Sequence, residues 1–173
     1  MVTTKILVVD GHDGAGKTTI AKCIAERYGM KYVKPFSDSL GDLIAWAYRQ
    51  QKFEFANNIA LAAIEKQLSD NKGIDLVFDR HWLSMYTVLP EEFHSLWQRP
   101  ITICCWADVN TTINRLRSRN EFEVNEWNHE YYCEAYKNYA IKYGTMLLNT
   151  SENDDLENNM RLVGKYLNSL KEG

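Results

Sequence analysis

Several features that would assign a protein class are missing from this chain of 173 residues. Its four cysteines form no CxxC pair, and Cys104 and Cys105 stand together inside an apolar run, where thiols usually pack as small hydrophobes. A zinc site is therefore not expected. The cysteine pattern favours a reducing, cytoplasmic environment.

Membrane and nucleic-acid signals are also lacking. No apolar run approaches the ~20 residues of a membrane-spanning helix, and a formal net charge of −3 provides no basic field for a nucleic-acid backbone. The sequence contains no repeats, low-complexity tracts or linker. We therefore expect one soluble, cytoplasmic domain over residues 1–173, with neither a membrane nor a polynucleotide as partner. A homodimer is compatible with the sequence, which leaves the oligomeric state open.

A glycine-rich stretch after the first apolar run carries the most specific motif. Gly11, four free positions and then Gly16-Lys17-Thr18 satisfy the phosphate-loop pattern. Glycines let backbone N–H groups point inward around phosphates at a helix N-terminus, Lys17 adds a positive charge, and Thr18 offers a hydroxyl to Mg²⁺. The alternative is a glycine-rich turn before an ordinary helix, which has no need of Lys-Thr after the last glycine. The predicted triphosphate-binding residues are Gly11, Asp13, Gly14, Ala15, Gly16, Lys17, Thr18 and Thr19.

Strands and helices alternate along the chain. Apolar runs predict strands at 6–9, 31–34, 74–78, 101–106 and 145–148. Apolar residues at helical spacing lie between them, with a stop at Gly29 and an N-cap at Asp108. This alternation predicts a three-layer α/β domain with a five-stranded parallel sheet flanked by helices, whose ligands gather at the carboxyl ends of the strands.

The second motif is Asp79-Arg80-His81 with Ser84 three residues later, at the tip of a buried strand. A carboxylate there would lie beside the phosphate loop and could organise Mg²⁺, while Arg80 could face an acceptor phosphate. A strand-end aspartate that caps the next helix, with Arg80 in solvent, is the alternative.

A group of arginines is the third signal. Arg115 and Arg119 are four residues apart and share a helix face, so together they can reach one phosphate and neutralise charge during phosphoryl transfer. A solvated helix face is the competing interpretation.

Taken together, these residues resemble thymidylate kinases and the wider nucleoside monophosphate kinase family over nearly the whole chain. The resemblance implies the sheet order 2-3-1-4-5, a lid at about residues 115–125, and an acceptor-sugar contact at Asp13. It also implies that Phe55, in the helix that continues through Asn58, stacks on the acceptor base. Asn149, Thr150 and Ser151 fall where the donor adenine loop of the family lies.

Three positions depart from the family pattern. Gly14 stands where one subgroup keeps an arginine, so the transition-state arginine has to come from the lid. Ile59 replaces the arginine that reads the thymine edge, and Lys34 precedes Pro35 where the family has an arginine. The identity of the acceptor base therefore does not follow from the resemblance.

The sequence thus predicts a kinase that uses ATP and Mg²⁺ to phosphorylate a deoxynucleoside monophosphate, with a pyrimidine such as that of dTMP or a modified one as base. Lys17, Asp79, Arg115 and Arg119 are the predicted catalytic residues, and Thr18 and Asp79 the predicted metal ligands. A deoxynucleoside kinase, which phosphorylates a 5′-hydroxyl, and a catalytically silent nucleotide-binding module are the alternatives.

Of four tyrosines in one helix, we interpret Tyr131, Tyr132 and Tyr136 as packing residues. The predicted substrate-binding residues are Asp13, Lys34, Pro35, Phe55, Asn58, Ile59, Arg80, Ser84 and Tyr139.

Overall fold

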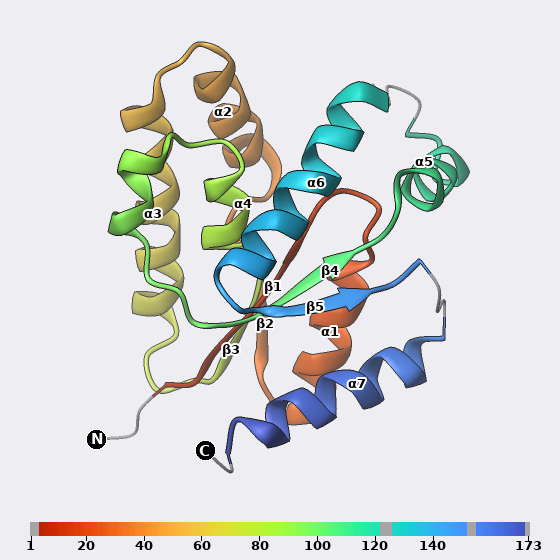
Figure 1. The fold of residues 1–173 in the computed structure, drawn as a ribbon. Helices are drawn as coiled ribbons and strands as arrows, with labels where there is room; N and C mark the ends of the chain where they lie inside the picture. Colours follow the sequence, from red (N-terminus) through yellow and green to blue (C-terminus); the bar gives the residue numbers. More distant parts are fainter. Residues whose placement is uncertain (1–3, 122–125, 152–154, 172–173) are drawn as a thin grey trace.

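A computed structural model describes residues 4–121, 126–151 and 155–171 of the chain. Its centre is a parallel sheet with strand order β2-β3-β1-β4-β5, as predicted (Figure 1). The apolar run that forms β1 is buried on both faces, as is typical of a central parallel strand. The strands are β1 (Ile6–Gly11), β2 (Lys31–Val33), β3 (Leu76–Asp79), β4 (Ile101–Trp106) and β5 (Met146–Asn149).

Helices cover both faces of the sheet and make the fold three-layered, because successive side chains of a strand point to opposite faces. Val8 packs into the core under α2, α3, α4 and α6, whereas Leu7 and Val9 pack into the core under α1 and α7. The helices are α1 (Lys17–Tyr28), α2 (Asp38–Arg49), α3 (Phe53–Asp70), α4 (Trp82–Tyr86), α5 (Val109–Ser118), α6 (Glu126–Lys142) and α7 (Leu156–Ser169), and a 3₁₀ helix spans Glu91–Leu96.

The strand ends lie within two residues of their predicted positions. Gly29 is the C-cap of α1, and the Asp108 carboxylate accepts the Thr111 N–H at the start of α5. Strand β3 begins later than predicted because Ile74, which is 45% exposed, still belongs to the preceding turn.

Strand register brings three strand tips together. Val9 of β1 pairs with Asp79 of β3, and Gly11 pairs with Cys105 of β4. The motifs at residues 10–19 and 79–84 therefore lie at the same edge of the sheet. None of the described helices is long and apolar enough to cross a bilayer.

Candidate active site

The phosphate loop joins β1 to α1 at the carboxyl end of the central strand. Gly16 is the N-cap of α1 and has a left-handed φ of 82°. Gly11 lies so close to β4 that a Cβ atom there would stand 2.3 Å from the carbonyl oxygen of Cys105. No described side chain caps α1, so the positive dipole end of this helix is suited to bind an anion.

Two cations meet at Asp13 inside this loop. Lys17 Nζ lies 3.6 Å from the Asp13 carboxylate, and Arg80 pairs with the same carboxylate oxygen. Burial lowers the pKa of Lys17 to about 8, and Arg80 is the main reason that the pKa of Asp13 lies below its usual value. Asp13 therefore lies between two cations, and a phosphate group could bind to the same two cations.

The predicted metal ligands are in direct contact. Thr18 Oγ1 donates to Asp79 Oδ2 over 2.6 Å, and the Tyr32 hydroxyl donates to the same oxygen over 2.7 Å. Asp79 is fully buried, and its Oδ1 has no hydrogen-bond partner among the described residues. Mg²⁺ prefers oxygen ligands and is usually held by one or two carboxylates together with water and substrate phosphates. The unpaired buried oxygen beside a hydroxyl fits that ion.

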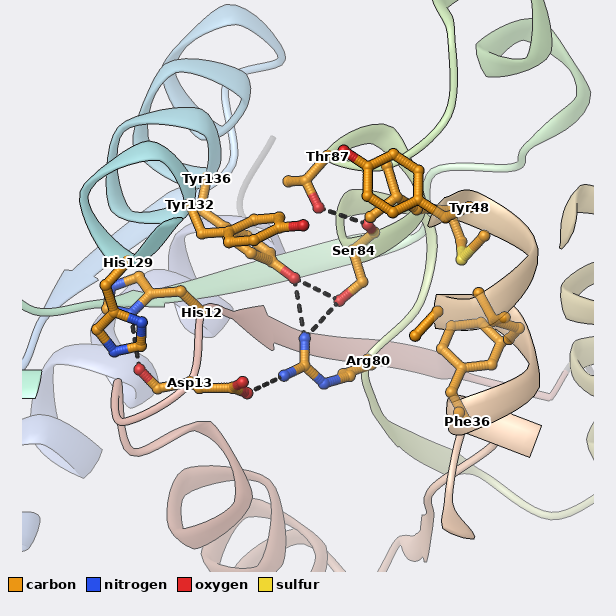
Figure 2. A pocket seen from close by; sticks show the side chains of 15 residues that line it. His12, Asp13, Phe36, Tyr48, Arg80, Ser84, Thr87, His129, Tyr132 and Tyr136 are labelled. Atoms are coloured by element: carbon orange, nitrogen blue, oxygen red, sulfur yellow. Dashed lines mark hydrogen bonds and ion pairs between the residues drawn. The ribbon is translucent and has the colours of Figure 1, made fainter. Parts of the chain in front are cut away.

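Arg80 is held in an unusual backbone conformation with one edge of its guanidinium enclosed. Its φ of 75° is left-handed, which costs a residue with a side chain roughly 1–2 kcal/mol. Nη1 donates to the Tyr136 hydroxyl at 2.9 Å, to Ser84 Oγ at 3.0 Å and to the Gly11 carbonyl at 3.3 Å. Nη2 faces Asp13 (Figure 2). The protein therefore fixes one edge and leaves the other beside the phosphate loop.

A cavity of about 350 Å³ opens next to Arg80, between the phosphate loop and helices α2, α4 and α6. Figure 2 shows Asp13 on the side of the phosphate loop, Phe36 and Tyr48 on the far side, and Arg80 and Tyr136 between them. Aromatic walls with a few convergent polar groups and a volume in this range are typical of a small-molecule site.

A second hollow of about 170 Å³ lies against the phosphate loop and is lined in part by Arg115, Arg119 and Thr150. Arg115 Nη1 donates to the Gly14 carbonyl at 3.1 Å and to Thr150 Oγ1 at 3.0 Å, and Nη2 donates to the Thr150 carbonyl at 2.8 Å. Arg115 thus ties the phosphate loop to the segment after β5. Arg119 is the C-cap of α5 and lines the same hollow.

The turn that carries Thr150 is held by its two neighbours. Asn149 Oδ1 accepts the Ser151 N–H over 2.9 Å, and Ser151 Oγ accepts the Asp108 N–H over 2.7 Å. Of the three residues expected at the donor adenine, Thr150 lines the hollow and the other two shape the turn. Residues 122–125 of the expected lid lie outside the described residues.

The described wall of the cavity comes from the phosphate loop, α2, α4 and α6 and not from α3, so several residues expected at the acceptor do not line it. Phe55 is 44% exposed and lines a separate hollow with Trp46 and Phe93. The side chain of Ile59 packs against the core, and Asn58 is exposed. The geometry therefore gives no support to base stacking on Phe55 or to base contacts from Asn58 and Ile59.

Three more residues that the sequence assigned to the substrate do not line this cavity either. Lys34 is exposed and Pro35 is buried, and neither lines the cavity, although the next residue, Phe36, does. Tyr139 packs against Tyr86 with ring centroids 5.8 Å apart and is absent from the cavity wall. Arg80 and Ser84 line the cavity as expected, together with Asp13.

Three residues on one face of α6 were not predicted. His129, Tyr132 and Tyr136 all line the cavity. Their spacing of three and four residues places them on one helical face. That spacing is the sequence signal from which a shared position on the cavity wall could have been predicted. Tyr136 in particular is a polar contact of Arg80 and not only a packing residue.

His12, inside the phosphate loop, was also missed. Its Nε2 accepts the Ala107 N–H over 3.1 Å, which leaves the ring proton on Nδ1, 3.0 Å from the Asp13 carbonyl. Burial lowers the pKa of His12 to about 4, so the ring is neutral near pH 7. It therefore braces the loop against Ala107, the residue that follows β4. A free position of the motif gives no sequence signal for this role.

Comparisons with known proteins agree with this fold. No protein-family model matches the chain. A probable thymidylate kinase of Metallosphaera sedula is 24% identical, in an alignment that covers 83% of each chain.

Solved structures are similar over nearly their whole length. The deoxyadenosine kinase of M. mycoides with the products dCMP and a flexible dCDP has a TM-score of 0.67 at 20% identity, covering 95% of this chain and 99% of that one. The YorR protein of Bacillus subtilis in complex with phosphorylated GDP has a TM-score of 0.66 at 16% identity, covering 97% and 98%. The chain thus has the P-loop kinase fold, and its sequence is similar to that of a probable thymidylate kinase.

Proposed function

We propose that this protein is a kinase that uses ATP and Mg²⁺ to transfer a phosphoryl group to the 5′-phosphate of a deoxynucleoside monophosphate. The observation that carries the proposal is the convergence of Lys17 and Arg80 on Asp13, at the junction of the phosphate loop and the cavity. Two cations on one point suit a reaction in which donor and acceptor phosphates must approach each other despite their negative charges.

Each part of the site has a separate task in this proposal. The phosphate-loop backbone and Lys17 hold the donor phosphates, and Arg80 orients the acceptor phosphate within the cavity. Thr18 and Asp79 would hold Mg²⁺, which neutralises phosphate charge when bound. The hollow beside Thr150 receives the donor base, and Arg119, which lines that hollow, is proposed to reach the transferring group when the donor is bound. Catalysis then consists mainly of positioning and charge stabilisation.

The residues that line the cavity favour a monophosphate over a nucleoside as acceptor. A 5′-hydroxyl must lose a proton, which calls for a general base, whereas an acceptor phosphate is already ionised at neutral pH. Among the described residues that line the cavity, Asp13 is the one carboxylate, and it is paired with Arg80 and Lys17. Arg80 also lowers the pKa of Asp13, which weakens it as a base.

A deoxynucleoside kinase is the second candidate. It is favoured by the likeness to the solved deoxyadenosine kinase structures, which share this fold. In that case the acceptor hydroxyl would have to reach Asp13 and displace Arg80 from it. A silent binding module is less well supported, because it has no need of the Thr18–Asp79 contact.

The base of the acceptor is proposed to be a pyrimidine, on the basis of the resemblance to thymidylate kinases. The described wall of the cavity includes Phe36, Tyr48 and Tyr132 but no Asn, Gln, Glu or Lys side chain. Recognition of the base edge by hydrogen bonds is then limited mainly to hydroxyl groups, and stacking and shape decide the preference. We expect more than one deoxypyrimidine monophosphate to be accepted.

A coupled assay of ADP release tests these proposals. Native protein would be assayed with dTMP, dUMP, dCMP, dAMP and dGMP and with the matching deoxynucleosides, and the Lys17→Ala variant would be the catalytic control. Turnover with monophosphates alone supports the main proposal, and turnover with nucleosides alone supports the second candidate. Native protein that releases no more ADP than Lys17→Ala with any acceptor would contradict both.

A further inference from the structure

A chain of hydrogen bonds runs from Arg80 along the wall of the cavity and ends on a buried carboxylate behind it. Asp10, at the end of β1, is fully buried. Its Oδ2 accepts the N–H groups of His81 at 2.9 Å and Ser84 at 3.1 Å, and its Oδ1 accepts the Ser84 hydroxyl and the Gly11 N–H at 3.1 Å. These donors meet the hydrogen-bonding requirement of a buried carboxylate.

The direction of the remaining hydrogen bonds follows from counting protons. A carboxylate only accepts, so the single proton of the Ser84 hydroxyl is directed to Asp10. Ser84 Oγ must then accept from the Tyr136 hydroxyl, which lies 2.7 Å away. The Tyr136 oxygen in turn accepts from Arg80 Nη1 over 2.9 Å.

Tyr136 can maintain these donor and acceptor roles because its hydroxyl stays protonated. Its side chain is 3% exposed, and burial raises its pKa, so the hydroxyl retains its proton near neutral pH. It belongs to α6, whereas Ser84 belongs to α4 and Asp10 to β1. One tyrosine hydroxyl therefore connects the wall of the cavity with the central strand.

We infer that Tyr136 is a positioning residue for the acceptor phosphate, which it serves by fixing the Nη1 edge of Arg80 through the chain Arg80–Tyr136–Ser84–Asp10. The inference rests on the proposed function. With Nη1 enclosed, Nη2 is the edge that can exchange Asp13 for a phosphate oxygen. Without the tyrosine hydroxyl, Nη1 loses the nearest of its three acceptors and keeps Ser84 Oγ at 3.0 Å and the Gly11 carbonyl at 3.3 Å. The guanidinium is then held less firmly in the productive orientation.

The increment in affinity that the 5′-phosphate provides is the quantity to measure. Calorimetry would give the dissociation constants of dTMP and thymidine, and of dCMP and deoxycytidine, for native protein, Tyr136→Phe and the control Tyr131→Phe. Tyr131 lies on the same helix, is 51% exposed and does not line the cavity. We expect Tyr136→Phe to weaken monophosphate binding about 10- to 100-fold, as for loss of a hydrogen bond to a charged group. Nucleoside affinity should not change, and Tyr131→Phe should behave as native protein.

A double-mutant cycle with Arg80→Ala asks whether the tyrosine acts through the arginine. In the Arg80→Ala background, Tyr136→Phe should have no further effect on monophosphate affinity. An equal loss of nucleoside affinity, an undiminished effect in the Arg80→Ala background, or a Tyr136→Phe protein with native affinity would overturn the inference while leaving the proposed function intact. Native protein that binds none of the four ligands would overturn the proposed function and this inference with it.

Discussion

Acid should destabilise this protein through two buried histidines, and His81 offers the more direct test. His81 is 4% exposed, its ring contacts Phe78 and Trp97 edge to face, and its Nδ1 has no hydrogen-bond partner among the described residues. Burial lowers its pKa from 6.5 to about 4. Between these two values the folded state binds fewer protons than the unfolded state. Stability is therefore fully present above pH 6.5 and is lost as the pH falls towards 4.

The size of the effect follows from the same shift. One pKa unit corresponds to about 1.4 kcal/mol. At pH 5 the unfolded-state pKa of 6.5 lies roughly one and a half units above the pH, whereas the folded-state pKa of about 4 lies below it. His81 should therefore account for about 2 kcal/mol of the stability lost between pH 7.5 and pH 5. His12, whose pKa is also lowered to about 4 by burial, should account for a similar amount.

Urea unfolding of native protein, His81→Phe and His81→Gln at pH 7.5 and 5.0 measures this contribution. The two variants differ in packing, so their stabilities at pH 7.5 need not agree. Both remove the titrating group, however, and both should gain about 2 kcal/mol relative to native protein on acidification. Variants that lose stability with falling pH as steeply as native protein would refute the argument.

Three further predictions concern the reaction itself. Lys17→Ala should reduce turnover by several orders of magnitude and leave the unfolding transition cooperative, because the residue acts on phosphate charge; near-native turnover in the coupled assay would exclude the proposed kinase. Thr18→Ala should raise the Mg²⁺ concentration for half-maximal activity, since it removes the hydroxyl beside Asp79; an unchanged Mg²⁺ titration would place the metal elsewhere. Arg119→Ala should lower kcat more than it raises the KM for ATP, whereas Arg115→Ala should mainly raise that KM, because its guanidinium holds Gly14 and Thr150; steady-state kinetics that reverse this order would contradict the assignment.

Local patterns were sufficient for most of the fold. An apolar run buried on both faces, a glycine where the loop meets β4 and helical spacing after Lys17 are consequences of short-range chemistry, and the predicted elements lie where the structure has them. The pairing of Thr18 with Asp79 could also be anticipated, because the tips of adjacent parallel strands meet at one edge of the sheet. The strand order itself came from family resemblance, since many orders are compatible with the same alternation of elements.

The walls of the cavity depend on how helices pack, and the sequence could not supply that. Phe55 and Tyr136 both stand at helical spacing in helices rich in apolar and aromatic residues, where an aromatic residue suits a core and a site equally well. Only the packing of α2, α4 and α6 around the phosphate loop decides that Tyr136 meets Arg80 and that Phe55 lies on another surface. Periodicity specifies which face of a helix is buried, whereas the neighbour that buries it is chosen by contacts between residues far apart in the chain.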